Sequence, residues 1–417
     1  MVWRALALLL GILLIPHLDI TTSSPHHIQA QSADWYQWRG PNRDGHSAET
    51  GLLKEWPAGG PRQLWRGTGA GTAYSSFSAS NNRLFTLGAR GDVEYVMAFD
   101  ANSGKKLWET AHGRRFRNEQ GDGPRSTPTV DGDRVYAFGG SGDLTALDAA
   151  TGKRFWSVNV VQTFGGSTPY WGYSESPLIY GDRIVLNAGG RRASIVAVNK
   201  ADGSTLWQNH NDEPAYSSPM LLRTGSLAQI VFFTGARALA VDPRDGRLLW
   251  SYNKVANNTA NIATPVVRGT KVFFSSDYGT GAALLDVKAA GNIASATEVY
   301  FTREMRNHHA SSVLVGDHIY GFNSSILTAL TFDTGEVAWR NRSVGKGSLI
   351  YADQRLYLYG ENGTMGLAEA TPSGYNERGR FSISLSTGNP AWSHPIITQG
   401  RLIIRDQDNI YAYLVRP

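Results

Sequence analysis

Short runs of alternating hydrophobic and polar residues dominate the chain, and turn residues separate them. The clearest example is the stretch 125–156, RSTPTVDGDRVYAFGGSGDLTALDAATGKRFW. In it STPTV, RVYAF, DLTALD and KRFW read as four strands, with DGD, GG and ATG as the turns between them. Such a unit has two apolar faces and two open edges, so it needs stacked copies of itself to become stable.

An end signature recurs along the chain: Asp or Asn, then Gly four residues later, then Trp four residues further. Complete copies are Asp100/Gly104/Trp108, Asp148/Gly152/Trp156, Asn199/Gly203/Trp207 and Asp242/Gly246/Trp250, and Thr331/Gly335/Trp339 has Thr in place of Asp. The acidic or amide side chain caps a turn, Gly accepts a positive φ, and Trp is a large flat filler between two sheets. In two further units Tyr300 and Phe381 stand near the position of the missing Trp.

A start signature recurs as well, and the number of its copies gives the number of repeat units. Its copies are YSSF at Tyr74, RSTP at Arg125, YSESP at Tyr173, YSSP at Tyr216, IATP at Ile262, HASS at His309, GSLI at Gly347 and WSHP at Trp392. The spacing of about 40 to 50 residues is that of a four-stranded propeller blade. After the last start only three strands follow, whereas QLWRG around Trp65 reads as an isolated last strand. We therefore predict an all-β, eight-bladed β-propeller over residues 34–417, closed by an N-terminal strand that completes the C-terminal blade.

The N-terminus and the composition indicate an exported protein. Arg4 precedes an apolar run, Ala5–Ile15, which is too short to span a bilayer, so we predict a signal peptide and linker over residues 1–33; an uncleaved anchor is the alternative. The chain has no cysteine, so we expect no disulfide and no lipid attachment. We expect a soluble periplasmic or extracellular monomer with no transmembrane segment in the mature chain. The net charge of +5 comes from scattered basic residues, which does not favour nucleic-acid binding.

Several stretches resemble the PQQ-binding-like β-propeller repeat family. They are WYQWRGPNRDG, GDGPRSTPTVDGDRVYAFGGSGDLTALDAATGK, WGYSESP, MRNHHASS, GKGSLIYADQRLYL and WSHPIITQGRLIIRDQDNIYAY, and together they cover essentially all of the predicted mature chain. The resemblance implies the propeller fold. It leaves the activity open, because the superfamily contains quinoprotein dehydrogenases and also non-catalytic propellers such as the outer-membrane assembly factor BamB.

Blade starts should converge on the central channel, and their polar residues are the candidate site. Arg125, Glu175, Asn261, Lys346 and His394 are candidate cofactor ligands. Arg125 and Lys346 suit the carboxylates of an anionic cofactor, and Glu175 and Asn261 offer oxygen ligands for calcium. His308 and His309 follow each other, so on a strand only one of them would point into the channel. The alternative interpretation is that these polar residues only hold water.

Two differences from the quinoprotein dehydrogenases argue against the same activity in this chain. Those enzymes stack PQQ against a vicinal cysteine pair, which this chain lacks, and no Asp stands at a blade start, so His308 or His309 would have to act as the base. We therefore favour a non-catalytic scaffold that binds an envelope protein or a small ligand. The alternatives are a PQQ- and calcium-dependent oxidoreductase of alcohols or sugars, and an assembly-factor-like interaction module.

A second candidate surface is the loop sequence TPYWGY. Its aromatic residues, Tyr170, Trp171 and Tyr173, would contact a protein or sugar, or else pack over the channel.

Overall fold

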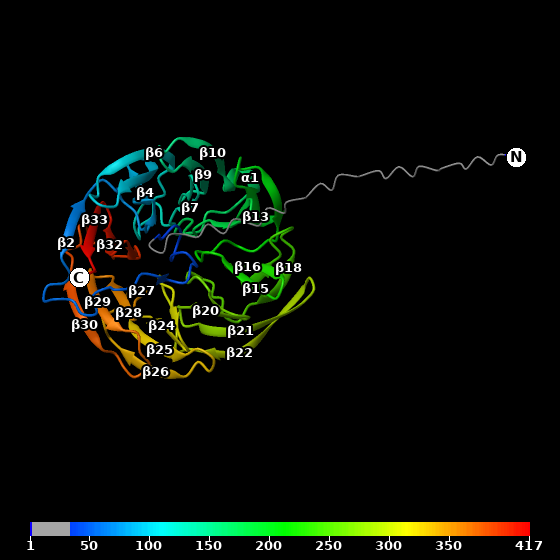
Figure 1. Cartoon of the computed structure of the whole chain (residues 1–417). Coiled ribbons are helices and arrows are strands. Elements are labelled where there is room, and N and C mark those ends of the chain that lie inside the picture. The colour runs from blue at the N-terminus through cyan, green and yellow to red at the C-terminus, as the bar shows by residue number, and fades with distance from the viewer. Residues whose placement is uncertain (2–33) are drawn as a thin grey trace.

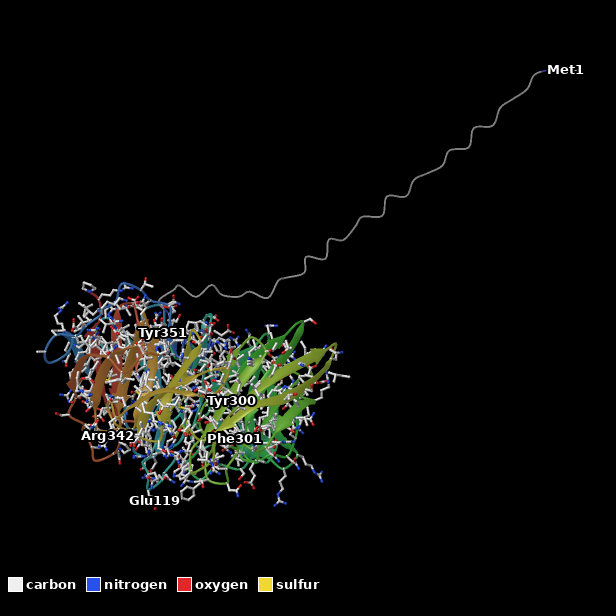
Figure 2. The ribbon with its side chains drawn as sticks, turned by 90° about the horizontal axis from the view of Figure 1, so that it is seen from below. Met1, Glu119, Tyr300, Phe301, Arg342 and Tyr351 are labelled. Carbon is white, nitrogen blue, oxygen red and sulfur yellow. The ribbon has the colours of Figure 1, made fainter. Side chains whose placement is uncertain are left out.

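A computed structural model describes Met1 and residues 34–417, so the predicted signal peptide lies outside the described residues. Eight sheets are arranged in a ring around a central channel, as Figure 1 shows face-on. Seen from the side in Figure 2, the ring is a disc with Glu119 at one face and Tyr351 toward the other. The prediction of an eight-bladed β-propeller is confirmed.

The first four blades follow one another along the chain. They are β3 (Ser78–Ser80), β4 (Arg83–Arg90), β5 (Val93–Asp100) and β6 (Lys106–Arg114); β7 (Thr129–Asp131), β8 (Arg134–Phe138), β9 (Asp143–Asp148) and β10 (Arg154–Asn159); β11 (Leu178–Tyr180), β12 (Arg183–Gly190), β13 (Ala193–Asn199) and β14 (Thr205–Asn209); and β15 (Met220–Thr224), β16 (Leu227–Phe233), β17 (Ala238–Val241) and β18 (Leu248–Tyr252). A one-turn helix, α1 (Val160–Phe164), follows β10. No helix in the described part of the chain is long and apolar enough to cross a membrane.

The next two blades repeat this arrangement, and the last two draw on the N-terminal segment. The fifth is β19 (Val266–Arg268), β20 (Lys271–Ser276), β21 (Gly281–Ala290) and β22 (Ile293–Thr302), and the sixth is β23 (Val313–Val315), β24 (His318–Asn323), β25 (Ile326–Thr331) and β26 (Val337–Asn341). The seventh is β27 (Gly347–Ala352), β28 (Arg355–Gly360), β29 (Thr364–Glu369) and β30 (Glu377–Ser382), extended by β1 (His46–Ser47), which runs parallel to β27. The eighth is β31 (Ile396–Thr398), β32 (Arg401–Asp406), β33 (Asn409–Leu414) and β2 (Gln63–Gly67).

Ring closure takes the predicted form. β2 pairs antiparallel with β33, from Gln63 opposite Tyr413 to Gly67 opposite Ile410. Arg405, which is 1% exposed, ties this last blade to the first: its guanidinium donates to the carbonyl oxygens of Leu87 at 2.6 Å and Ala70 at 2.9 Å. One arginine thus satisfies backbone acceptors at the seam between the two ends of the chain.

The end signature joins neighbouring blades. The indole nitrogen of Trp108 donates to the carbonyl oxygen of Ala149 in the next blade at 3.2 Å, and its ring covers Gly152 there. The same tryptophan-to-next-blade hydrogen bond recurs at Trp65, Trp156, Trp207 and Trp339. Tyr300 and Phe381 replace Trp in β22 and β30 and cover Gly335 and Gly60. These rings fill the gaps between blades, as predicted from the pattern.

The start signature also joins neighbouring blades, at the side that faces the channel. Its hydroxyls bridge adjacent blades: Ser75 Oγ donates to the Ser126 carbonyl at 2.5 Å, and Ser176 Oγ accepts from the Thr127 amide at 2.9 Å. Further bridges of this kind join Ser176 to Ser218, Ser217 to Ala263, Thr264 to Ser311 and Ser76 to His394. These positions are therefore mainly architectural, because they replace hydrogen bonds that a sheet edge leaves open.

The segment 35–47 lies within the channel, which the sequence pattern did not predict. Arg39 and Arg43 are each 2% exposed. Arg39 donates to the carbonyl oxygen of Ser312 at 2.6 Å, and Arg43 donates to that of Ser176 at 2.8 Å. Because these acceptors belong to the sixth and third blades, the segment crosses the channel and holds blades that are not neighbours. The N-terminal segment therefore positions the site described next.

The outer strand of the seventh blade, β30, lies in a stretch without regular alternation. Gly379, at φ +148°, lies within this strand and packs against Trp56, so the strand is irregular enough to be missed by an alternation pattern.

Candidate functional site

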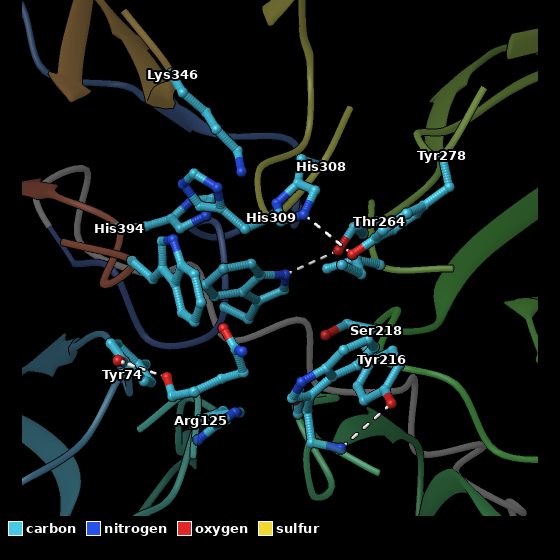
Figure 3. A pocket seen from close by; sticks show the side chains of 16 residues that line it. Tyr74, Arg125, Tyr216, Ser218, Thr264, Tyr278, His308, His309, Lys346 and His394 are labelled. Carbon is cyan, nitrogen blue, oxygen red and sulfur yellow. Dashed lines mark hydrogen bonds between the residues drawn. The ribbon is translucent and has the colours of Figure 1, made fainter. Parts of the chain in front are cut away.

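A cavity of about 310 Å³ lies at the channel mouth, where the blade starts meet (Figure 3). Its lining consists of Trp38, Tyr74, Gln120, Arg125, Trp171, Ser174, Tyr216, Ser218, Ile262, Thr264, Tyr278, His308, His309, Lys346, Trp392 and His394. The size is that of a site for a small molecule or for one large side chain of a partner.

Aromatic rings make up most of the wall. Tyr74 packs on Trp392 with 4.8 Å between ring centroids, and Trp171 packs on Tyr216 at 5.5 Å. Trp38 comes from the channel segment, and its indole nitrogen donates to Thr264 Oγ1 at 2.9 Å. These contacts fix the rings, so the cavity offers a preformed flat apolar surface.

Two cations lie on opposite sides of the cavity, Arg125 and Lys346 (Figure 3). Arg125 stands over the Tyr74 ring at 5.1 Å, and it donates to the carbonyl oxygens of Gly121 at 2.9 Å and Gly123 at 3.1 Å. Burial lowers the pKa of Arg125, but an arginine side chain keeps its charge at neutral pH. The Nζ of Lys346 lies 3.4 Å from Glu361 Oε1. The cavity therefore holds one partly buried cation, Arg125, and a second cation, Lys346, that lies near a carboxylate.

Three histidines share the wall near Lys346. Both His308 and His309 line the cavity, so the expectation that only one would face it was wrong. Its premise was a strand, whereas residues 308–310 form a bend and β23 begins only at Val313. Burial holds the pKa of His309 well below its usual value and lowers the pKa of His394 to about 3. These imidazoles are therefore neutral at physiological pH.

Two of the proposed cofactor ligands, Glu175 and Asn261, lie outside this lining. Glu175 is 1% exposed, and its Oε1 accepts from the Asn187 amide at 2.7 Å; burial raises its pKa to about 8. Asn261 is also 1% exposed and borders a neighbouring hollow of about 820 Å³. Its Oδ1 accepts from the Asn257 amide at 3.0 Å and from Ser276 Oγ at 3.1 Å. Both side chains have structural hydrogen bonds, and the structure does not bring them together.

The loop aromatics separate into three environments. Trp171 lines the cavity, whereas Tyr173 is fully buried and donates to the Ala188 carbonyl oxygen at 2.8 Å, which places it in the core. Tyr170 is 64% exposed and donates to Glu119 Oε1 at 3.0 Å. The rim of the cavity thus presents an exposed aromatic ring beside an acidic residue.

The cavity fits part of the PQQ–calcium pair that the resemblance implied. Its rings and two cations suit a flat polycarboxylate. Calcium needs six to eight oxygen ligands, and no carboxylate occurs among the described residues that line the cavity. The residues present therefore fit a planar anion and do not fit calcium beside it.

The sequence interpretation missed several lining residues. Trp38 and Trp392 were visible, the first in WYQWRGPNRDG and the second at a blade start, but neither was assigned to a site. Tyr278 gave no signal, because it lies in the turn between β20 and β21. Only the closed ring brings these residues together.

Comparison with known proteins gives relatives of two kinds. A Yersinia pestis protein named outer membrane protein assembly factor BamB is 22% identical over 272 residues, which is 62% of this chain and 66% of that protein, so the match spans just under two thirds of the relative. The structure of BamB from Moraxella catarrhalis matches with a TM-score of 0.64 and 15% identity, over 85% of this chain and 99% of the other. Quinohemoprotein alcohol dehydrogenase from Comamonas testosteroni matches with a TM-score of 0.68 and 13% identity, over 93% of this chain and 81% of the other. At these identities the structures show a shared fold.

A family match covers more than half of the chain. The family described as outer membrane protein assembly factor BamB matches residues 92–341, which run from the third strand of the first blade to the end of the sixth. Since this match covers six of the eight blades, in whole or in part, the chain belongs to this family of PQQ-like, BamB-type β-propellers.

Proposed function

We propose that the protein is a non-catalytic binding scaffold of the cell envelope. Its channel-mouth cavity takes a flat ring that carries negative charge, either as a free small molecule or as part of a partner protein. One observation carries this proposal: Arg125 and Lys346 lie on opposite sides of a cavity that three Trp and three Tyr also line.

Arg125 is arranged to hold an anion. Tyr74 supports its guanidinium from one side, and the carbonyl oxygens of Gly121 and Gly123 use part of its donor capacity. A planar guanidinium held in this way loses little conformational entropy when it binds a carboxylate, sulfonate or phosphate. The flat part of the ligand would lie against Trp38, Trp171 or Trp392.

The rim supports an interaction role. Tyr170, at 64% exposed, lies beside Trp171 with the two rings perpendicular and their centroids 5.2 Å apart, so an aromatic surface continues from the cavity to the outside. Relatives in the family carry the name of an outer-membrane assembly factor. An envelope protein that inserts an acidic, aromatic segment would use both the rim and the cavity.

An oxidoreductase is the second candidate, and the geometry favours it less. Oxidation of an alcohol needs a base for its hydroxyl proton and an acceptor for its hydride, and a quinoprotein would supply that acceptor with a quinone beside calcium. The described lining residues include no carboxylate to hold calcium, and Glu175 lies in the structural hydrogen bond to Asn187. His308 and His309 line the cavity and remain the candidate bases, so it is the missing calcium ligands that count against this function.

Fluorescence titration tests the proposal, because three tryptophans line the cavity. Anthraquinone-2-sulfonate and PQQ are the anionic probes, and uncharged 2-hydroxymethylanthraquinone is the neutral control. We expect the anionic probes to quench and saturate at micromolar concentrations, with no change on adding calcium or a chelator. Arg125→Gln and Lys346→Gln should each weaken binding by about tenfold or more, as for a lost charge-assisted hydrogen bond.

The matched control is Arg134→Gln, because Arg134 also stacks on an aromatic ring, Phe155 at 4.6 Å, but lies outside the cavity. Equal affinity for the neutral probe, or unchanged affinity in Arg125→Gln, would refute the charged-ring proposal. Calcium-dependent PQQ binding together with dye reduction by alcohols would instead establish the oxidoreductase. For a protein ligand, crosslinking in envelope extract should give a product that Trp171→Ala loses and that an anionic probe competes away.

A further inference from the structure

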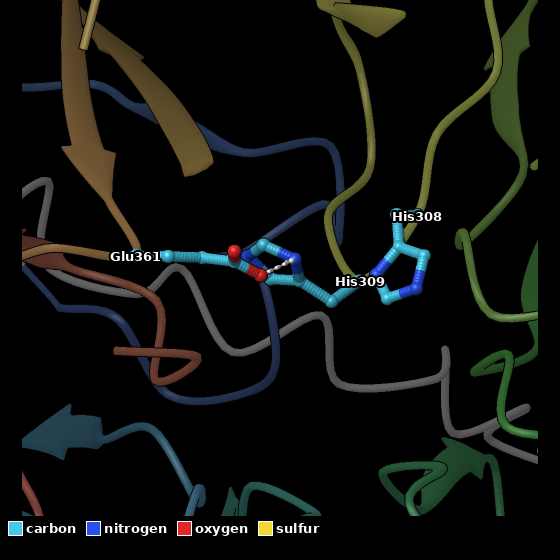
Figure 4. Close-up of side chains that lie close together, drawn as sticks. All are labelled: His308, His309 and Glu361. Carbon is cyan, nitrogen blue, oxygen red and sulfur yellow. Dashed lines mark ion pairs between the residues drawn. The ribbon is translucent and has the colours of Figure 1, made fainter. Parts of the chain in front are cut away.

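Two histidines of one cavity wall lie beside a carboxylate that is not part of the lining, and groups of these kinds bind transition metals. His308 and His309 lie just before β23, and Glu361 lies in the turn between β28 and β29 of the next blade. One ligand atom from each of the three residues lies within 4.8 Å of the other two. Figure 4 shows the two imidazoles and the carboxylate side by side, with His309 Nδ1 3.4 Å from Glu361 Oε1.

These histidines have ring nitrogens without hydrogen bonds. Within the described chain, neither ring nitrogen of His309 or of His394 has a hydrogen bond, nor does Nδ1 of His308, and His309 Nδ1 has only its 3.4 Å contact with Glu361. The His309 side chain is 9% exposed, and His394 is 5% exposed. Leaving a buried polar group unpaired costs about 1 to 3 kcal/mol, so several such groups on one wall indicate a missing ligand.

The surroundings orient the candidate ligand atoms. His308 Nε2 lies 3.0 Å from Tyr278 Oη, which leaves Nδ1 free to face the cluster. The indole nitrogen of Trp392 donates to Glu361 Oε1 at 2.6 Å. Metal-binding histidines and carboxylates commonly have such outer partners, which fix the tautomer and the direction of the lone pair.

We propose that His308, His309 and Glu361 bind a divalent transition-metal ion, with His394 as the fourth ligand. The rings of His309 and His394 are 6.4 Å apart between centroids, so His394 is the next imidazole beside the cluster. Two or three imidazoles and one carboxylate form a donor set for zinc, cobalt, nickel or copper, and not for calcium, which prefers oxygen. The proposal does not depend on the anionic ligand, since it concerns the metal alone.

Lys346 competes with a bound metal ion for the carboxylate of Glu361. Its Nζ is 3.4 Å from the same Glu361 Oε1, so without metal the ammonium group neutralises the carboxylate. A bound ion must displace this contact and tolerate a nearby positive charge. Removing the lysine charge should therefore tighten metal binding, which is the opposite of its expected effect on an anionic ligand.

Metal titration of the chelator-treated, untagged full-length protein tests the site. Zinc is followed by competition with a chromophoric chelator, and cobalt(II) by its visible absorption. We expect a cavity site of one ion per chain in addition to any ion held by His17, His26 and His27, which all variants retain. His309→Gln, His309→Ala and Glu361→Gln should each weaken the cavity site by about 10- to 100-fold.

The remaining variants make the test two-sided. Lys346→Met should tighten zinc binding by several-fold, and His318→Ala, a histidine of β24 outside the cluster, should bind as the unmodified protein does. Trp171→Ala should retain the metal while losing the anionic probes, which separates this proposal from the previous one. The inference is overturned if the unmodified protein binds no more zinc than the folded His309→Gln variant, or if Lys346→Met weakens the site.

Discussion

The indole ring of Trp108 lies directly against the backbone of Gly152 in the following blade: a β-carbon on this glycine would be 2.5 Å from Trp108 Cε3. The glycine also has φ +73°, a region that residues with side chains rarely adopt. Because Trp65 meets Gly104 and Trp156 meets Gly203 in the same way, one contact repeated around the ring sets the spacing of the blades.

Gly152→Ala should destabilise the ring through both effects. The left-handed conformation costs about 1 to 2 kcal/mol and the steric overlap adds about 1 to 3 kcal/mol. Gly132→Ala is the matched control, since Gly132 has φ +63° but open space around its missing side chain. Urea unfolding should show a loss about twice as large for Gly152→Ala. Equal losses would mean that the tryptophan contact is not tight.

Arg405→Met should weaken ring closure. The change leaves the carbonyl oxygens of Leu87, Ala70 and Gly71 without their buried donor. Each unsatisfied buried acceptor costs about 1 to 3 kcal/mol, so we expect a total loss of at least about 3 kcal/mol by urea unfolding. Arg401→Met, in the same strand but partly exposed, should cost less than about 1 kcal/mol. A similar small effect in both variants would contradict the proposed seam.

Glu175 should make stability depend on pH. Burial raises its pKa to about 8, so the folded protein holds a proton that the unfolded chain releases near its ordinary value. The stability of the folded state is therefore highest below the pKa that Glu175 has in the unfolded chain, and it falls as the pH rises toward the pKa in the folded protein. Between pH 5 and pH 8 the unfolding free energy should fall by about 2 to 4 kcal/mol.

Comparison with Glu175→Gln isolates that effect, because the amide oxygen still accepts from Asn187 and carries no charge. The slope of stability against pH should become smaller in this variant, while the exposed Glu55→Gln should keep the full slope. An unchanged slope in Glu175→Gln would show that another group carries the pH dependence.

Trp38 should contribute to the cavity through its ring more than through its hydrogen bond. Trp38→Ala should lower the affinity for anthraquinone-2-sulfonate by about tenfold, as expected for a buried aromatic contact. Trp38→Phe loses the hydrogen bond to Thr264 but keeps a flat surface, so its affinity should change by less than about threefold. Isothermal titration gives both values, and equal losses would assign the effect to the hydrogen bond.

The fold was predictable because its information is local and repeated. The Asp148–Gly152–Trp156 spacing recurs in five of the eight blades, once with Asn and once with Thr in place of Asp, and strand pairing between neighbours in sequence follows from short turns. The closing pair of β2 and β33 was predictable by counting, since one end of the chain lacked a strand and the other had a surplus one.

The site was only partly predictable, because its residues lie in irregular segments. The rule that neighbouring residues of a strand face opposite sides gave the wrong orientation for His308 and His309, because these residues lie in a bend. Glu361 was not considered, since it occupies a turn and meets His309 only after two blades have packed together. No alternation pattern predicts a turn side chain's direction, so these contacts depend on the three-dimensional fold.

The composite eighth blade has a consequence for how the protein is made. Its outer strand β2 is synthesised early, whereas its partner β33 is synthesised last. Until residues 409–414 arrive, both ends of the growing ring expose unpaired strand edges, which other chains and proteases recognise. Sealing the circle thus requires both segments, and a chain that lacks residues 409–414 leaves the edge of β2 unpaired.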